Sequence, residues 1–350
     1  MSVVQKLLVP IAWFYGSFLW LRNVAYDLKM IRIYRAKIPV ISVGNMTVGG
    51  TGKTPFIEYL LVHYSAQNIN ACVISRGYKR TTSGLQVVSD GKRIFGNALE
   101  YGDEPLQIAK KFPHSIVVVD EDRSRAVDYV TKRFNPALIL LDDGFQHRSL
   151  GRNVDIVMID GRKNLVKTPM LPAGRRREPL SALQRADLLV FTQVTSSSND
   201  ILASLKKYAT APSVGVRRQA KQFHSLANDR TASIDIFRNA PCVAFCGVGN
   251  PQGFKTTLAE IGVNILDFLI YPDHHIYSGA ELANIRRHFE LHKAQYLVTT
   301  EKDAMRLQSL NKNLDFPWDL CYFLEIEMTM VAGESILRYV LKEKIDRYLD

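Results

Sequence analysis

A glycine-rich loop at residues 47–54 follows directly on an apolar, β-rich run at residues 38–44. The loop reads Thr-Val-Gly-Gly-Thr-Gly-Lys-Thr, and a helix is expected to begin at Lys53. In this context the backbone N–H groups of the turn and the positive end of the helix dipole surround phosphate oxygens. The sequence therefore predicts a Walker A phosphate loop built onto a parallel α/β sheet.

Eight residues of this loop are candidate nucleotide ligands. Lys53 is expected to reach the β- and γ-phosphates of ATP, and the Thr54 hydroxyl is expected to bind Mg²⁺. Thr47 replaces the usual first glycine of the motif, so Gly49 and Gly50 are expected to supply the left-handed backbone angles. The predicted nucleotide-binding residues are Thr47, Val48, Gly49, Gly50, Thr51, Gly52, Lys53 and Thr54.

Short apolar runs alternate with helical stretches along the rest of the chain. Near-continuous apolar runs are typical of parallel strands that are covered on both faces by helices. The expected fold is α/β: a P-loop-containing, doubly wound, mainly parallel sheet plus a second, smaller α/β domain. The expected strands are 38–44, 70–75, 115–120, 137–142, 155–160 and 187–192 in the first domain, and 241–246, 263–270, 295–300 and 319–326 in the second.

These runs also give the expected domain boundaries. An N-terminal interfacial helix is expected over 1–30, the nucleotide-binding domain over 31–215 and the C-terminal α/β domain over 216–350. A polar stretch at 192–200 predicts a surface connection. The amphipathic segment 333–349 predicts a final helix that packs on either domain.

The N-terminal segment is apolar but short. Fifteen residues without a charge lie between Lys6 and Arg22, whereas a membrane-spanning helix needs about 18 or more. Basic residues flank the run, and the net charge of the chain is +11. This pattern favours a helix that lies in an anionic membrane surface, with a core helix of the first domain as the alternative. The charge is not accompanied by a zinc-finger or RNA-recognition signature, so nucleic acid is not an expected partner.

An apolar run that ends in two carboxylates predicts the metal side of the site. The run 137–142 ends in Asp142, and Asp143 follows it. Both lie at the carboxyl end of an expected strand, where open α/β sheets bind their ligands. One of the two aspartates is expected to hold Mg²⁺, directly or through water. Gln146 and His147 follow, and the pattern leaves open whether they belong to the site or make structural hydrogen bonds.

Eight motifs and the N-terminal apolar helix together resemble the tetraacyldisaccharide 4′-kinase family of bacterial lipid A biosynthesis. The resemblance covers nearly the whole chain. It implies two α/β domains with the site between them. It also implies transfer of the ATP γ-phosphate, with Mg²⁺, to the 4′-hydroxyl of a tetraacylated glucosamine disaccharide 1-phosphate at the cytoplasmic face of the inner membrane. The motifs are SVGNMTVGGTGKTP (42–55), SRGYKR (75–80), YGDEP (101–105), LLDDGFQH (140–147), LPAGRRREP (171–179), FCGVGNP (245–251), YPDHH (271–275) and TTEKDA (299–304).

The resemblance further implies which residues carry the transfer. The family's G-D-E-P aspartate and P-D-H histidine fall on Asp103 and His274, which implies a base and its partner that meet across the cleft. A sugar hydroxyl is a poor nucleophile, so a carboxylate must accept its proton as the new P–O bond forms. Asp103 is expected in a loop after the crossover from the second strand. Glu104 either assists the metal or caps the helix that follows.

Three arginines stand in the LPAGRRREP motif, and Arg177 matches the arginine of the family pattern P-x-G-x-L-R-E. An arginine fork fits phosphate oxygens, so Arg177 is expected to neutralise developing charge or to hold the lipid 1-phosphate. Arg176 replaces the usual leucine and is expected to face solvent. Tyr78 matches a family tyrosine near the site, whereas Lys79 stands where glycine is common.

Three other classes of function share some of these features. A regulatory GTPase normally carries N-K-x-D, which the chain lacks, since Glu301-Lys302-Asp303 has no spacer residue. A non-catalytic nucleotide-binding protein at a membrane surface does not explain an added acid–base pair. A P-loop kinase for a soluble sugar or nucleoside stays open if the N-terminal helix is buried.

The four cysteines form no C-x-x-C pair and predict free thiols in a reducing compartment. No obligate protein partner is inferred.

Overall fold

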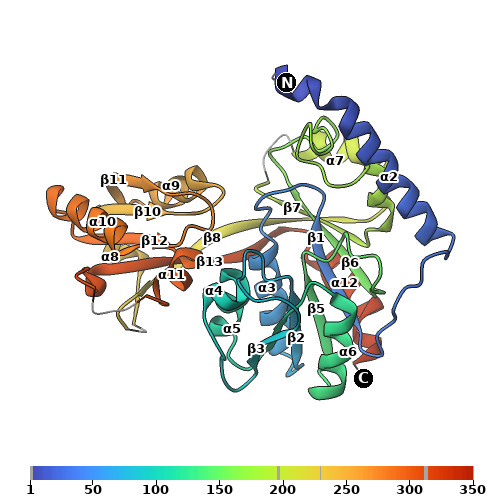
Figure 1. Cartoon of the computed structure of the whole chain (residues 1–350), viewed down its shortest axis with the longest axis horizontal. Coiled ribbons are helices and arrows are strands. Elements are labelled where there is room, and N and C mark those ends of the chain that lie inside the picture. Colours follow the sequence, from blue (N-terminus) through green and yellow to red (C-terminus); the bar gives the residue numbers. More distant parts are fainter. Residues whose placement is uncertain (1–2, 195–197, 229, 311–313, 350) are drawn as a thin grey trace.

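The structure, a computed structural model, describes residues 3–194, 198–228, 230–310 and 314–349. Within these residues thirteen strands form one sheet that runs through both halves of the molecule (Figure 1). The strands are β1 (Val40–Asn45), β2 (Ala71–Ser75), β3 (Gln86–Asp90), β4 (Ile116–Val119), β5 (Leu138–Asp142), β6 (Val154–Asp160), β7 (Leu188–Thr192), β8 (Ser213–Ser225), β9 (Thr231–Ala232), β10 (Pro241–Cys246), β11 (Asn264–Ile270), β12 (Tyr296–Thr300) and β13 (Cys321–Ala332).

The order across the sheet is β11-β10-β12-β13-β8-β7-β6-β1-β5-β2-β4-β3, and β9 pairs with β8. Neighbouring strands are parallel, except that β3 is antiparallel to β4, and β8 is antiparallel to β13 and β9. The expected α/β fold with a mainly parallel sheet is therefore confirmed. All ten expected strands are present, most with ends shifted by a residue or two, and β13 extends six residues beyond its expected end at 326.

Helices cover both faces of this sheet. They are α1 (Val3–Leu7), α2 (Val9–Asp27), α3 (Lys53–Ser65), α4 (Ala98–Tyr101), α5 (Asp103–Lys111), α6 (Arg123–Arg133), α7 (Ser198–Leu205), α8 (Ile234–Phe237), α9 (Pro251–Glu260), α10 (Gly279–Leu291), α11 (Glu301–Leu307) and α12 (Glu334–Lys344), with 3₁₀ turns η1 (Leu180–Arg185), η2 (Trp318–Leu320) and η3 (Asp346–Tyr348). The polar stretch expected at 192–200 continues β7 and leads into α7. Its residues 195–197 lie outside the described part of the chain.

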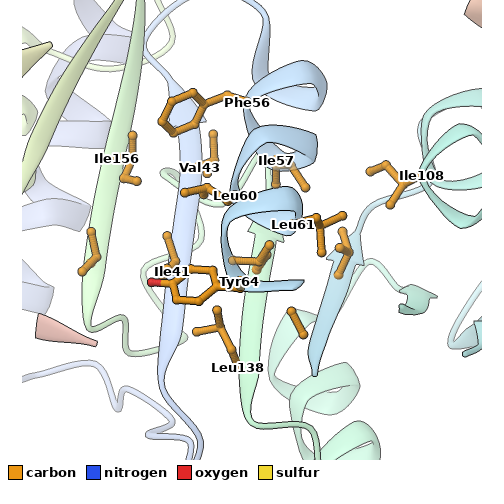
Figure 2. Close-up of a cluster of buried hydrophobic side chains, with 14 of the residues drawn as sticks. Ile41, Val43, Phe56, Ile57, Leu60, Leu61, Tyr64, Ile108, Leu138 and Ile156 are labelled. Atoms are coloured by element: carbon orange, nitrogen blue, oxygen red, sulfur yellow. The ribbon is translucent and has the colours of Figure 1, made fainter. Parts of the chain in front are cut away.

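Helix α3 is held against the centre of the sheet, which fixes the phosphate loop at its N-terminus. Figure 2 shows Phe56, Leu60 and Tyr64 of α3 facing the side chains of β1 and its neighbours. All six residues of β1 are buried, because helices cover the strand on both sides. The helix begins at Lys53, as predicted. The loop before it therefore lies at the carboxyl edge of the sheet, where α/β folds bind ligands.

Two long antiparallel strands, β8 and β13, join the two halves of the molecule (Figure 1). At one end Val216 and Met328 pack in the core of the first half, and at the other end Phe223 and Leu324 pack in the core of the second. Strand β8 was not predicted, because its middle carries a run of basic and polar residues that resembles a surface segment. The division at 215/216 thus falls inside a strand that belongs to both cores, and two separate domains stay a prediction.

Helix α12 near the C-terminus and helix α2 near the N-terminus differ in how far their side chains are buried. Helix α12 packs on the first half, where Leu337 and Leu341 join the core around β1. Helix α2 buries only Ala12, Leu19 and Asn23, which does not fit the alternative of a core helix. Within the described residues, no helix has both the length and the apolar character that crossing a membrane requires.

Candidate active site

Two glycines of the phosphate loop adopt backbone angles with positive φ. Gly49 has φ +114° and Gly52 has φ +86°, both in the region that side chains disfavour. The prediction for Gly49 is confirmed, whereas the prediction for Gly50 is wrong, since Gly52 supplies the second such angle. A Cβ on Gly49 would also come within 2.9 Å of the Arg175 guanidinium. The Asn45 side chain braces the loop by donating to Thr51 Oγ1 at 2.9 Å.

The arginine-rich loop lies directly beside the phosphate loop. The backbone N–H of Val48 donates to the carbonyl of Arg175 at 2.8 Å, and the backbone N–H of Arg177 donates to the carbonyl of Met46 at 2.7 Å. This short ladder holds the arginines of LPAGRRREP against the site. Arg176 is half-buried rather than facing solvent as expected, because its backbone pairs with Thr47.

A pocket of about 320 Å³ opens on the phosphate loop. One wall is the loop itself, residues 46–51, and a second is the carboxyl end of β6 with the residues after it. Arg175 closes one side, and Gly249 and Asn250 reach in from the other half of the molecule. The pocket therefore joins backbone donors with cations and suits a phosphorylated nucleotide. Of the predicted nucleotide ligands, Thr47 through Thr51 line it, whereas Gly52, Lys53 and Thr54 lie just beyond.

Asp143 forms ion pairs with both cations predicted for phosphoryl transfer, Lys53 and Arg177. Lys53 Nζ lies 3.5 Å from Asp143 Oδ1, and Arg177 Nη1 donates to both carboxylate oxygens at 2.8 and 2.9 Å. Burial raises the pKa of the Asp143 carboxyl, but Lys53 and Arg177 outweigh burial and bring that pKa below its usual value. Arg177 also reaches Asn45 of the phosphate loop, at 3.3 Å. The structure thus brings together three of the residues predicted from sequence.

The neighbouring Asp142 is in a different environment. Its Oδ2 accepts a hydrogen bond from Ser75 at 3.0 Å, while its buried Oδ1 has no partner among the described residues. Burial and the nearby Glu104 carboxylate raise the pKa of Asp142 to about 6. Thr54 is buried in the first turn of α3. An unsatisfied carboxylate oxygen that other anions crowd fits a bound divalent cation.

The Asp103 and His274 side chains meet, although 171 residues separate them in the sequence. His274 Nδ1 lies 3.1 Å from Asp103 Oδ2, and the Tyr78 ring stands edge-on to the His274 ring at 5.2 Å. Asp103 is not in a loop as expected: it is the first residue of α5, and Gly102 before it, at φ +92°, makes the turn. Its side chain is buried.

Three hydrogen-bonding contacts and the nearby charge of Lys302 favour the ionised form of Asp103. Burial raises the pKa of Asp103, but the hydrogen bond from His274 and the charges of Lys302 and Arg306 bring it well below its usual value. Asp103 Oδ1 accepts from the backbone N–H of Glu104 at 3.1 Å. Glu104 itself forms an ion pair with Lys302 of α11. The carboxylate form, which a base requires, is thus the form that these contacts stabilise.

The comparisons with known proteins agree along the whole chain. A family model described as tetraacyldisaccharide-1-P 4′-kinase matches residues 4–346. The chain is 38% identical over 350 residues to the tetraacyldisaccharide 4′-kinase of Chlorobium limicola, with 98% of each chain covered. The chain belongs to this family. It is 34% identical over 348 residues to the kinase of Chlorobium phaeobacteroides, covering 97% of this chain and 98% of that relative.

A crystal structure of the same family has the same fold. LpxK from Aquifex aeolicus in complex with ATP matches with a TM-score of 0.80 and 30% sequence identity. The match covers 98% of this chain and 100% of that one. Family membership is therefore supported by sequence and by structure.

In this member of the tetraacyldisaccharide 4′-kinase family, sequence reasoning missed several residues that hold the site together. Ser75 bonds Asp142, Lys302 pairs with Glu104, and Arg306 pairs with Asp103. Sequence signals for two of them existed: Ser75 opens SRGYKR, and Lys302 lies in TTEKDA. Gln146, left open before, donates to the carbonyl of Asn45 at 3.0 Å, which is a structural contact.

Two further positions are explained by the backbone or by burial. Burial and Arg123 lower the pKa of His147 to about 4, so its imidazole is neutral near pH 7. Lys79 has φ +58°, which accounts for the glycine that is common at this position in the family pattern. Its Nζ donates to the carbonyl of Asp273 at 3.0 Å, next to His274.

Proposed function

We propose that this protein transfers the γ-phosphate of ATP to the 4′-hydroxyl of a tetraacylated glucosamine disaccharide 1-phosphate, a step of lipid A biosynthesis. The observation that carries the proposal is the meeting of Asp103 and His274 in a chain that has a phosphate loop and matches the kinase family over residues 4–346. The P-loop and the two aspartates after β5 handle the nucleotide, and the Asp103–His274 pair handles the acceptor.

Each residue has a defined part in the transfer. The 4′-oxygen forms a bond to the γ-phosphorus while the bond from that phosphorus to the β,γ-bridging oxygen breaks, and ADP leaves. Asp103 takes the proton of the hydroxyl, and His274 orients the carboxylate. Lys53 and Arg177 move from Asp143 toward the charge that spreads over the phosphoryl oxygens. Both cations lie within 3.5 Å of the Asp143 carboxylate, so they start from the same place.

The proposed magnesium ligands are Asp142 and Thr54. Asp142 offers a buried oxygen without a partner among the described residues, whereas Asp143 is already paired with two cations. Glu104 faces the same region, since its charge raises the pKa of Asp142, but it is also paired with Lys302. A Mg²⁺ held by these residues would supply positive charge that offsets the negative charge of the phosphates.

Asp142→Asn tests this assignment. The substitution removes the anionic oxygen, so the Mg²⁺ concentration that gives half the maximal rate should rise at least about tenfold. The measurement is the initial rate of ATP-dependent phosphorylation over a Mg²⁺ series. Asp128→Asn, at an exposed carboxylate of α6 that pairs with Lys132, is the matched control and should not change the Mg²⁺ dependence. Unchanged Mg²⁺ dependence in both Asp142→Asn and Asp143→Asn would rule out a metal site at the end of β5.

Helix α2 is the proposed attachment to the cytoplasmic face of the inner membrane. Trp13, Phe14 and Phe18 are 73%, 80% and 65% exposed, although such side chains are normally buried. Lys29, Arg32 and Arg35, which are exposed in the segment after the helix, supply cations for anionic head groups. The protein is thus proposed to be monotopic, with its lipid substrate reached from the membrane surface.

Replacing Trp13, Phe14 and Phe18 together by serine tests the attachment. Burying one large apolar side chain contributes about 1.5–3 kcal/mol, so partition onto vesicles of anionic phospholipid should weaken at least about tenfold. Nucleotide affinity should stay unchanged, because α2 does not line the pocket. The control is Tyr339→Ser, at a 65% exposed aromatic side chain of α12. If the triple variant binds these vesicles as well as the parent does, α2 is not the anchor.

The activity itself is tested with γ-labelled ATP and a lipid A disaccharide 1-phosphate dispersed in detergent. Label should migrate with the lipid in thin-layer chromatography, and its amount should depend on Mg²⁺. A soluble sugar or a nucleoside offered in the same assay should gain no label. Labelling of these soluble acceptors but not of the lipid would favour the soluble-sugar kinase and overturn the proposal.

A further inference from the structure

Three motifs of the C-terminal half converge on the backbone of one residue, Gly247. Gly247, from FCGVGNP, donates its N–H to Asp303 Oδ1 at 3.0 Å. The carbonyl of Gly247 accepts from the backbone N–H of His274 at 3.0 Å and from Arg306 Nη1 at 2.9 Å. A Cβ on this glycine would approach His275 and Pro272 to 2.9 Å. Gly247 therefore fixes the backbone of YPDHH and the guanidinium of Arg306 at the same place.

Asp303, from TTEKDA, holds the other side of Arg306. Its carboxylate is fully buried and accepts from Thr300 Oγ1 at 2.6 Å, from Tyr277 Oη at 2.9 Å and from Arg306 Nη1 at 2.9 Å. With the Gly247 N–H included, four donors surround this carboxylate. A carboxylate saturated in this way is a rigid support, and so is the guanidinium bound to it.

The free end of that guanidinium reaches across to the first half of the molecule. Arg306 Nη2 donates to Asp103 Oδ2, the same oxygen that lies 3.1 Å from His274 Nδ1. The Arg306 and Asp103 side chains are 5% and 4% exposed. Because the contact is buried and shared with His274, it fixes the direction in which the carboxylate points. Oδ1, which accepts from the backbone N–H of Glu104, is the oxygen that Arg306 does not bind.

We propose that Arg306 is a positioning residue for phosphoryl transfer: anchored by Asp303 and Gly247, it holds the Asp103 carboxylate in the orientation in which it receives the proton of the acceptor hydroxyl. The proposal rests on the role of Asp103 proposed above. It also accounts for motifs that the chemistry left unused, since FCGVGNP and TTEKDA build the support for Arg306.

An arginine suits this task better than a lysine. The planar guanidinium contacts Gly247 and Asp303 through Nη1 and Asp103 through Nη2, whereas an ammonium group has one centre and no fixed fork. A base that is displaced by about 1 Å can cost on the order of a hundredfold in rate. Loss of the fork should therefore affect turnover more than it affects nucleotide binding.

The test uses the full-length protein with Arg306→Gln, Arg306→Lys and Asp103→Asn, and with Arg306→Gln combined with Asp103→Asn. Arg306→Gln should lower kcat at least about tenfold and leave the KM for ATP within about threefold, with partial recovery in Arg306→Lys. In the Asp103→Asn background, the Arg306 substitution should cost no more than about threefold further, because it acts through Asp103. Arg338→Gln, which removes an exposed ion pair with Glu334 on α12, is the control.

Each outcome decides between the claims. Multiplicative losses in the double variant, or a higher KM for ATP with unchanged kcat, would show a merely structural role and overturn the proposal. Wild-type kcat in Asp103→Asn would instead overturn the proposed base. If circular dichroism shows that Arg306→Gln is unfolded, Arg306→Lys alone and in the Asp103→Asn background carries the same comparison, because it keeps the buried positive charge.

Discussion

Lys53→Ala should lower kcat by about a thousandfold while the protein stays folded, because it removes a cation from the place where negative charge spreads in the transition state. Lys53 stands at the first position of α3, two residues after the last loop residue that lines the pocket, and its Nζ already lies 3.5 Å from Asp143. The helix core of Phe56, Leu60 and Tyr64 does not involve this side chain. The measurement is kcat for the lipid acceptor, with the melting temperature recorded alongside.

Lys132→Ala is the matched control for this loss of charge. Lys132 is an exposed residue of α6 that pairs with Asp128 on the same helix, so its removal should leave kcat unchanged. If Lys53→Ala keeps a third or more of the parent kcat, the loop does not act as a Walker A motif in catalysis.

Asp103→Asn and His274→Ala should each depress kcat, the first by about a hundred- to ten-thousandfold. The two side chains are in direct contact, and one orients the other, so the double variant should be little worse than Asp103→Asn alone. ATP binding, followed by equilibrium titration with a fluorescent nucleotide, should survive in all three variants. The control for the histidine is His114→Ala, at an exposed position between α5 and β4.

Fully multiplicative losses would mean that Asp103 and His274 act independently. Such a result would contradict the proposal that His274 acts by orienting the Asp103 carboxylate, even if each residue proved important. Wild-type turnover in Asp103→Asn would remove the base from the mechanism.

The nucleotide half of the site was predictable from the sequence because its signals are local. The phosphate loop, the start of α3 at Lys53 and the aspartates at the end of β5 each follow from a few consecutive residues. A parallel strand, a glycine-rich turn and the start of a helix follow one another within about fifteen residues, so a short stretch of sequence indicates all three. The loop angles were the exception, since composition does not distinguish Gly50 from Gly52 as the residue with positive φ.

The acceptor half was not predictable from local patterns. Asp103 comes from α5, His274 from the turn that follows β11, and Arg306 from α11. Asp103 lies 171 residues from His274 and 203 residues from Arg306 in the sequence. Asp103 and His274 were named only through family resemblance, and Arg306 was missed because a single arginine in a short helix carries no pattern of its own. Strand β8 was missed for a related reason: its exposed middle bridges two cores and is therefore polar.

The position of the new phosphate tests the central claim most directly. Product made from unlabelled ATP and the lipid A disaccharide 1-phosphate would be purified and studied by phosphorus–proton correlation NMR. The account predicts one new phosphomonoester coupled to the proton at C4′ of the distal glucosamine, with the 1-phosphate unchanged and one ADP formed per product. Phosphate attached at any other hydroxyl, or ADP formed with release of inorganic phosphate and no new ester, would contradict it.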